Sequence, residues 1–260
     1  MLRSLLYVPA HSERFLSKAH ERGADCVILD LEDAVPEENK DGAREGLAQS
    51  IPAVGRNGAK VFVRINRGPR RGADAEAASR ANADGVVLAK AELGELDDLA
   101  ELRVPLIAML ESPAAVLDAR AYARHPAVQG LVVGSEDLAT ALGGEPVPEV
   151  LRFPKLLAHY AAKAEGKMSF GLLRSVADFR DLDAIEAAAR EARMHGFDGA
   201  TCVHPAIVPI LNKAFTPSAE EIAWAERVME AAQSGQGAFT VDGRMVDAPV
   251  IARARAILGR

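Results

Sequence analysis

Two carboxylates each follow a short apolar segment, in positions that suit a shared divalent cation. Residues 107–110 are apolar and lead into Glu111, and the apolar run that begins at Leu131 leads into Asp137. Short apolar runs bounded by turn-forming residues are typical of strands buried on both faces. A carboxylate just past such a strand lies at the carboxyl-terminal edge of the sheet. The pair therefore predicts a metal site there, and an acid in the first turn of a helix remains the alternative for each residue.

The chemistry predicted from this pair is metal-assisted activation of a carbonyl compound. Two carboxylates with open positions suit Mg²⁺, with Mn²⁺ able to take its place, because such ions keep waters and accept substrate oxygens. A cation held by Glu111 and Asp137 could chelate a 2-keto acid and polarise its C=O bond. Arg64 would hold that oxygen or stabilise an enolate. A structural ion pair of Arg64 with Asp30 or Glu32 is the alternative.

Charged or polar residues also follow other predicted strands, where the active-site residues of a barrel lie. Lys90 could form a Schiff base, but surrounding acids should keep it protonated, so we interpret it as an ion-pair partner. His204 could act as a base, although a histidine that bonds within its own loop is the commoner case. A solvated rim accounts for only part of this set, which comprises Asp30, Glu32, Asp33, Arg64, Asn66, Lys90, Glu111, Glu136, Asp137 and His204.

Apolar runs alternate with Ala-rich amphipathic segments throughout most of the 260 residues. This alternation predicts a (β/α)₈ TIM barrel with an α/β architecture. A doubly wound sheet is the rival, but it requires a Gly-rich phosphate turn after the first strand, and residues 9–12 (Pro-Ala-His-Ser) do not provide one. The predicted strands are 4–8, 26–30, 61–65, 85–88, 107–110, the apolar run that begins at 131, 168–173 and 199–203, and the predicted helices include 12–22, 92–101, 113–124, 149–165 and 181–195.

The segment after the predicted barrel is longer than the barrel requires. We divide the chain into a barrel, residues 1–214, and a C-terminal helical and hairpin extension, residues 215–260. A capping-box pattern at 216–221 precedes a helix that runs to about 232, and residues 235–243 are predicted to form a strand and a turn. Such an extension would cover one end of the barrel or reach a neighbouring subunit.

Composition excludes several classes of function. The net charge of −6 and the absence of a basic run argue against nucleic acid as a partner. The two cysteines, Cys26 and Cys202, lie in apolar runs and are interpreted as small core residues. No apolar stretch reaches the roughly 18 residues of a membrane span, and the amino terminus lacks the apolar region of a signal peptide. A cytoplasmic protein without a membrane partner is expected.

Seven motifs, taken in order, resemble one known family. They are Leu-Asp-Leu-Glu-Asp-Ala-Val at 29–35, Val-Arg-Ile-Asn at 63–66, Ala-Lys-Ala-Glu at 89–92, Leu-Glu-Ser-Pro at 110–113, Gly-Ser-Glu-Asp-Leu at 134–138, Cys-Val-His-Pro at 202–205 and Gly-Arg-Met-Val-Asp at 243–247. The chain resembles the citrate lyase beta-subunit-like family of the HpcH/HpaI aldolase superfamily, which includes malyl-CoA and citramalyl-CoA lyases. The resemblance runs from Arg3 to nearly the last residue.

The resemblance implies a Mg²⁺-dependent barrel enzyme, usually a homotrimer. It assigns the metal carboxylates to Glu111 and Asp137 and substrate binding to Arg64, with Glu111 beside the substrate. It assigns the paired acids that order metal waters and the arginine to Glu32 and Asp33. It also assigns a catalytic aspartate, given to an adjacent subunit's active site, to Asp247, for which the sequence alone predicts a helix N-cap.

The expected activity is cleavage or formation of a C–C bond in a short 3-hydroxyacyl thioester of the malyl-CoA, citramalyl-CoA or citryl type, giving acyl-CoA and a 2-keto acid. The alternatives are a malyl-CoA-type thioesterase on the same scaffold, a Schiff-base aldolase through Lys90, and a citrate lyase beta subunit that depends on a carrier protein. Relatives usually carry an aspartate at the end of the seventh strand, where this chain has Gly-Leu-Leu-Arg at 171–174. This departure leaves the natural substrate open.

Overall fold

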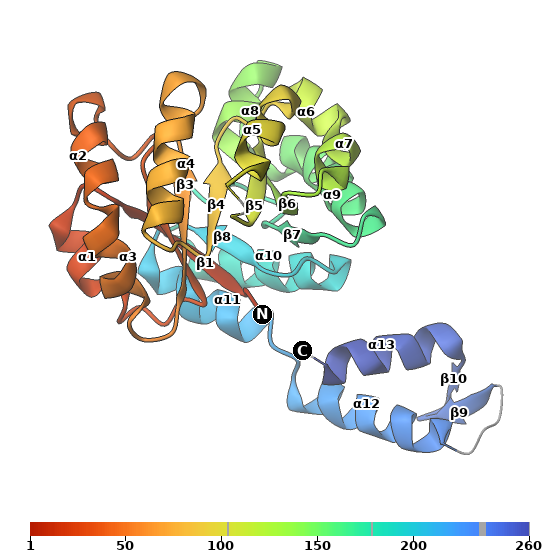
Figure 1. Ribbon diagram of the computed structural model, residues 1–260. Coiled ribbons are helices and arrows are strands. Elements are labelled where there is room, and N and C mark those ends of the chain that lie inside the picture. The colour runs from red at the N-terminus through yellow and green to blue at the C-terminus, as the bar shows by residue number, and fades with distance from the viewer. Residues whose placement is uncertain (103, 178, 234–237, 260) are drawn as a thin grey trace. The chain divides into compact units, whose positions relative to one another are not determined.

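The computed structural model describes residues 1–102, 104–177, 179–233 and 238–259, and most of these form a barrel of parallel strands (Figure 1). Each strand pairs with its neighbours in sequence, and β1 also pairs with β8. A single bridge from Phe170 to Gly199 lies between β7 and the start of β8, so the barrel is nearly closed. The predicted (β/α)₈ fold is confirmed. The strands are β1 Ser4–Pro9, β2 Cys26–Asp30, β3 Lys60–Ile65, β4 Gly85–Leu88, β5 Leu106–Leu110, β6 Val128–Val133, β7 Met168–Phe170 and β8 Ala200–Cys202.

Alternate residues of each strand separate into two apolar cores. One core fills the barrel interior and includes Leu5, Ile28 and Met109. The other packs between the strands and the outer helices and includes Leu6, Leu29 and other residues one position away. Successive side chains of a strand point to opposite faces, so each inward residue is followed two positions later by another. Four residues therefore point inward because each comes two positions after an inward residue: Tyr7 after Leu5, Asp30 after Ile28, Arg64 after Phe62 and Glu111 after Met109.

Helices surround the strands on the outside of the barrel (Figure 1). The predicted helix 113–124 is divided at Asp118, and the predicted strand 168–173 ends at Phe170 because Gly171 has a φ of +146°. The elements are α1 Glu13–Ala19, η1 Glu37–Asn39, α2 Lys40–Glu45, α3 Leu47–Gly55, η2 Gly68–Arg70, α4 Arg71–Arg80, η3 Leu93–Glu95, α5 Leu96–Ala100, α6 Pro113–Leu117, α7 Ala119–Arg124, α8 Ser135–Leu142, α9 Pro148–Ala164, α10 Leu182–His195, η4 Pro205–Ile207 and α11 Val208–Ala214.

Residues 216–260 form a second unit, distinct from the unit of residues 2–215. It contains α12 Ala219–Ala232, the hairpin of β9 Phe239–Val241 and β10 Arg244–Val246, and α13 Ala248–Leu258. The capping box is present, because Ser218 Oγ accepts from the Glu221 backbone and Glu221 bonds back to the Ser218 backbone. Residues 235–237 of the predicted strand and turn lie outside the described part of the chain. Within that part, no helix combines the length and hydropathy that a membrane crossing requires.

Candidate active site

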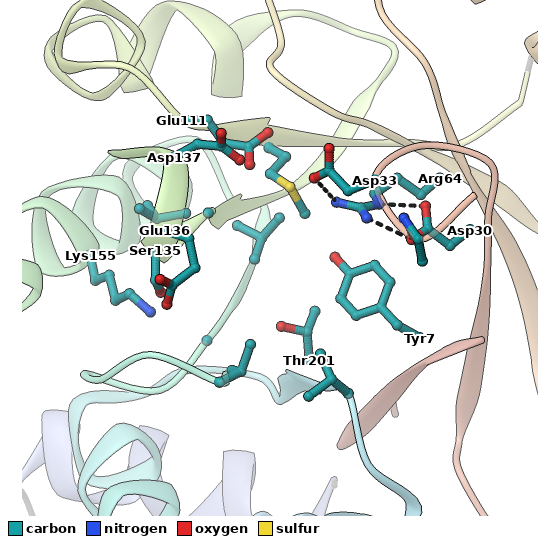
Figure 2. Close-up of a pocket in the computed structure, with 18 of the residues that line it drawn as sticks. Tyr7, Asp30, Asp33, Arg64, Glu111, Ser135, Glu136, Asp137, Lys155 and Thr201 are labelled. Carbon is teal, nitrogen blue, oxygen red and sulfur yellow. Dashed lines mark hydrogen bonds and ion pairs between the residues drawn. The ribbon is translucent and has the colours of Figure 1, made fainter. Parts of the chain in front are cut away.

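The top of the barrel interior opens into a cavity of about 440 Å³ that is lined by apolar and charged side chains (Figure 2). The inward-pointing residues at the strand ends, among them Tyr7, Asp30, Arg64 and Glu111, line it together with Asp137 from α8. Strand periodicity therefore brings predicted site residues from β2, β3 and β5 to one place. These residues lie at the carboxyl-terminal end of the barrel, where enzymes of this fold carry their active sites.

Arg64 is held by carboxylates on one side of the cavity. The register of β2 against β3 places Asp30 opposite Arg64, and Nε and Nη2 donate to the two Asp30 oxygens at 2.7 and 2.6 Å. Nη1 lies 3.0 Å from Glu32 Oε2 and 3.4 Å from Asp33 Oδ2. The guanidinium also lies 5.1 Å from the Tyr7 ring centroid. Burial opposes the charge, but the pairing with Asp30 raises the pKa of Arg64, so the cation is permanent.

Lys90 connects this arginine cluster to Asp137. Its Nζ lies 2.5 Å from Glu32 Oε1, 3.3 Å from Asp33 Oδ1 and 3.8 Å from Asp137 Oδ2. Burial would lower the pKa of Lys90, but the bond to Glu32 and the charges of all three acids raise it. An amine held protonated cannot attack a carbonyl group, so the contacts favour the ion-pair interpretation over the Schiff base.

Glu111 and Asp137 face one another across the upper wall of the cavity (Figure 2). Glu111 directly follows β5, as predicted for a carboxylate at a strand end. Asp137 lies in the first turn of α8, which was the alternative considered for it. Glu111 Oε2 accepts from the Lys90 backbone at 2.6 Å. Burial, with the hydrogen bond to Asp137 and its charge, raises the pKa of Glu111 to about 8. A cation that binds here would displace this proton and stabilise the ionised carboxylate of Glu111.

Gly134 makes room for the Glu111 side chain. A Cβ atom at position 134 would lie 2.3 Å from Glu111 Oε1 and 2.5 Å from Glu111 Cγ. The glycine follows β6 at the next inward position after Val132, so any larger residue there would displace the carboxylate. Gly134 belongs to the Gly-Ser-Glu-Asp-Leu motif at 134–138, but its sequence context did not indicate this function.

The carboxylates present fit a magnesium ion. Within the described ranges no cluster of three or more His, Cys, Asp or Glu is suited to a metal, so the pair of Glu111 and Asp137 is the smaller set to consider. Mg²⁺ is commonly held by one or two carboxylates and retains waters or takes oxygens from a substrate. Burial and the facing carboxyl group of Asp137 both raise the pKa of Glu111, and a bound cation would offset both effects. Their assignment as ligands stays a prediction.

The wall of the cavity opposite Arg64 carries a buried lysine (Figure 2). Lys155 of α9 lines the cavity there and donates to the Arg174 carbonyl oxygen at 2.8 Å. Burial lowers the pKa of Lys155 to about 7, although the charge of Glu136 opposes the shift. Glu136 Oε1 accepts a 2.5 Å hydrogen bond from Ser175 Oγ. Glu136, part of the polar rim in the sequence, thus lies on this wall, away from Arg64.

Three of the residues considered from the sequence have local structural partners. Asn66 bonds to Lys40, Asp74 and the Leu31 carbonyl. His204 Nδ1 accepts from the Ala206 backbone at 3.2 Å, and its ring stacks on Phe179, which agrees with a histidine bonded within its own loop. Asp247, in the second unit, caps α13 by accepting from the Val250 backbone at 3.4 Å.

Tyr7 and Lys155 were not among the site residues predicted from the sequence. Tyr7 could have been found from strand alternation, because it is two positions beyond the inward Leu5. Among the residues that the structure describes, its buried hydroxyl has no hydrogen-bond partner. Lys155 occupies a core position of α9, four residues after Leu151 and three before Ala158, both of them buried. A lysine within an apolar stripe of a helix is the signal that was available.

Comparisons with known proteins agree on one family. The sequence profile described as HpcH/HpaI aldolase/citrate lyase matches residues 3–205. The chain is 36% identical to a (3S)-malyl-CoA thioesterase of Cereibacter sphaeroides, over 99% of this chain and 94% of that protein. It is 37% identical to a citrate lyase subunit beta-like protein of Mycobacterium tuberculosis, over 98% and 94%. A crystal structure of the protein CitE from M. tuberculosis, in complex with magnesium, acetoacetate and coenzyme A, has a TM-score of 0.84 and 34% identity, covering 98% of this chain and 96% of that one.

The raised pKa of Glu111 predicts that cation binding depends on pH. With a pKa of about 8, this carboxyl is protonated at pH 6, and a cation must displace the proton. Magnesium affinity should therefore rise about tenfold per pH unit from pH 6 towards 8 and level off above that. Calorimetry in buffers of different ionisation enthalpy would measure both the affinity and the proton released.

Two variants separate this effect from general surface charge. Glu111→Gln should remove the pH dependence together with most of the affinity. Glu76→Gln, which changes an exposed acid on α4 that pairs with Arg80, should retain both. An affinity in the unaltered protein that is flat from pH 6 to 8, with no proton released, would show that the cation does not displace a proton from Glu111.

Proposed function

Because the chain belongs to the HpcH/HpaI aldolase/citrate lyase family, we propose that it cleaves or forms a C–C bond in a short 3-hydroxyacyl-CoA thioester. The family resemblance predicted from the motifs is confirmed, and with it the prediction of an aldolase-type lyase. The products in the cleavage direction are an acyl-CoA and a 2-keto acid, and the substrate is of the malyl-CoA, citramalyl-CoA or citryl type. The single observation that carries this proposal is the facing pair of Glu111 and Asp137 in one cavity with the fixed cation Arg64.

Glu111 and Asp137 would hold the magnesium ion, or a manganese ion in its place. The presence of magnesium in the M. tuberculosis CitE complex supports this assignment. The bound ion would supply Lewis acidity to the keto acid's oxygens. Lys90 neutralises part of the surrounding negative charge from a distance of 3.8 Å to Asp137, and its backbone N–H orients Glu111.

Arg64 would bind the keto oxygen and stabilise the negative charge that develops during C–C cleavage. Its hydrogen bonds with Asp30 fix the guanidinium in place before the substrate arrives, so no reorganisation is needed at the moment of reaction. Glu32 and Asp33 restrain it from the other side, and we assign them the ordering of Arg64 and of metal-bound waters. In cleavage, a base takes the hydroxyl proton, the C–C bond breaks, and the thioester enolate is protonated at carbon.

Asp247 would act as the base in the condensation direction, removing a proton from the thioester's α-carbon. We propose that the extension of residues 215–260 carries it into the active site of a neighbouring subunit in a cytoplasmic homotrimer. Asp247 directly follows β10 and is the N-cap of α13. This position between two regular elements supports a fixed placement of its carboxylate. In a hydrolytic reaction the same carboxylate would activate water.

A thioesterase is the second candidate, and the relative in C. sphaeroides with that activity in its name favours it. The two reactions would share the cation and Arg64. They differ in which bond breaks: hydrolysis of the thioester releases free CoA and an intact hydroxy acid, whereas C–C cleavage releases acyl-CoA and a keto acid. Turnover of free CoA esters would also argue against dependence on an acyl carrier protein.

Product analysis tests the proposed reaction. Purified protein with Mg²⁺ and malyl-, citramalyl- and citryl-CoA should release an acyl-CoA and a 2-keto acid in equal amounts. Glu111→Ala should lower metal-dependent kcat/KM by about a thousandfold or more, since the cation's stabilisation is lost. Glu76→Ala is the matched control. Free CoA with intact hydroxy acid would favour the thioesterase, and full activity of Glu111→Ala in metal-stripped buffer would refute the metal-assisted mechanism.

Mixing two inactive variants tests the placement of Asp247. Glu111→Ala and Asp247→Ala subunits should each be inactive alone, but co-refolded in equal amounts they should recover up to about a quarter of the unaltered activity. This fraction is the chance that a subunit with an intact Glu111 adjoins a neighbour with an intact Asp247. If Asp247 served its own subunit's site, the mixture would stay inactive.

A further inference from the structure

Lys155 is a buried cation directed into the cavity, and the proposed mechanism does not use it. Its side chain is 4% exposed, and it occupies the apolar stripe of α9 between Leu151 and Ala158. Figure 2 shows its ammonium group on the side of the cavity opposite Arg64. Lysine is rarely buried so completely unless it is paired, so its position calls for a partner.

The protein itself provides Lys155 with few of the hydrogen-bond acceptors that an ammonium group requires. An ammonium group has three N–H donors, and the hydrogen bond seen for Lys155 in the described part of the chain is the one to the Arg174 carbonyl oxygen. Glu136 is close enough to affect it electrostatically but makes no ion pair with it within 4.0 Å in the same described residues. An oxygen of Glu136 is instead bonded to Ser175 Oγ.

Arg64 differs in this respect. Its Nε, Nη1 and Nη2 atoms are all directed at carboxylates of Asp30, Glu32 and Asp33. The two side chains therefore differ: Arg64 directs most of its five N–H donors at acids and keeps few for a ligand, whereas Lys155 directs one of its donors at the protein. Both line the same cavity as Glu111 and Asp137.

We propose that Lys155 binds a second carboxylate of the keto acid, so that the cavity prefers a four-carbon 2-oxo dicarboxylic acid to a keto acid with one carboxylate. This inference rests on the proposed function, in which one end of the keto acid is held beside Glu111 and Asp137. The other end would then accept hydrogen bonds from the ammonium group on the far wall. A site built to bond a buried polar group discriminates strongly against an analogue that lacks it.

The surroundings of Lys155 favour an anion as its ligand. Burial removes water from the ammonium group and lowers its pKa, and a carboxylate would offset that cost of desolvation. Val176 and Gly171 also line the cavity and carry no charge. Glu136 limits the net positive charge there, and its bond to Ser175 keeps one of its oxygens engaged.

Binding of the keto acid alone tests the inference, because it requires no turnover. Calorimetry of the Mg²⁺-loaded protein with fresh oxaloacetate and with pyruvate should give a tighter Kd for oxaloacetate by about tenfold to a hundredfold. Lys155→Met, which keeps the length of the side chain and removes a buried charge, should abolish that preference and leave pyruvate binding unchanged. Malate and lactate repeat the comparison without decarboxylation.

Two further variants complete the experiment. Lys155→Arg should retain part of the preference, and Lys163→Met, which removes a cation on the same helix that pairs with Asp198, should retain all of it. Equal affinities for the two acids in the unaltered protein, or an equal loss for both in Lys155→Met, would overturn the inference. If the preference is found but no thioester is cleaved, the proposed function fails while the carboxylate site stands.

Discussion

The register between β2 and β3 places Asp30 opposite Arg64, and the polar side of the active site is built outward from this pair. The two side chains are 2% and 12% exposed, so the ion pair is buried and both hydrogen bonds are protected from water. Removing one partner of such a pair commonly costs about 3–5 kcal/mol, because a charge is left buried alone. Glu32 and Asp33 contact Arg64, Lys90 contacts both acids, and Asp137 lies next to Lys90. One fixed arginine thus begins a chain of charges that ends at the proposed cation site.

The facing pair of Glu111 and Asp137, the guanidinium of Arg64 and the ammonium group of Lys155 lie on different sides of the cavity (Figure 2). Burial, together with the facing carboxyl group of Asp137, raises the pKa of Glu111, and a dication bound by the two groups would offset the cost of ionising it. The side walls carry Arg64 and Lys155, which differ in how many of their donors the protein already uses. Such an arrangement suits a ligand with an oxygen-rich end near the acids and negative charge towards the cations. It also explains why the barrel interior becomes polar only in its last inward positions, beyond an apolar core that includes Ile28, Phe62 and Met109.

The fold and half of the site could be predicted from the sequence for one reason: buried parallel strands are continuous apolar runs that end abruptly. Asp30, Arg64 and Glu111 lie at or near the ends of those runs and were therefore predicted to lie at the rim of the barrel. Residues that reach the site from helices were harder to predict, because a helix contributes single side chains whose direction depends on packing. Lys155 is such a case. The role of Gly134 could not be predicted either, because the Glu111 side chain that it accommodates comes from the neighbouring strand and is distant in the sequence. The catalytic role predicted for Asp247 comes from the family resemblance alone.

The assignment of Glu111 and Asp137 to one cation is the claim on which the proposed chemistry depends. The most direct measurement is anomalous diffraction from crystals of this protein grown with Mn²⁺. An anomalous peak within bonding distance of a carboxylate oxygen from each residue, absent in crystals of Glu111→Gln, is the expected result. A peak at another place in the barrel, or no peak at a saturating Mn²⁺ concentration, would contradict the assignment.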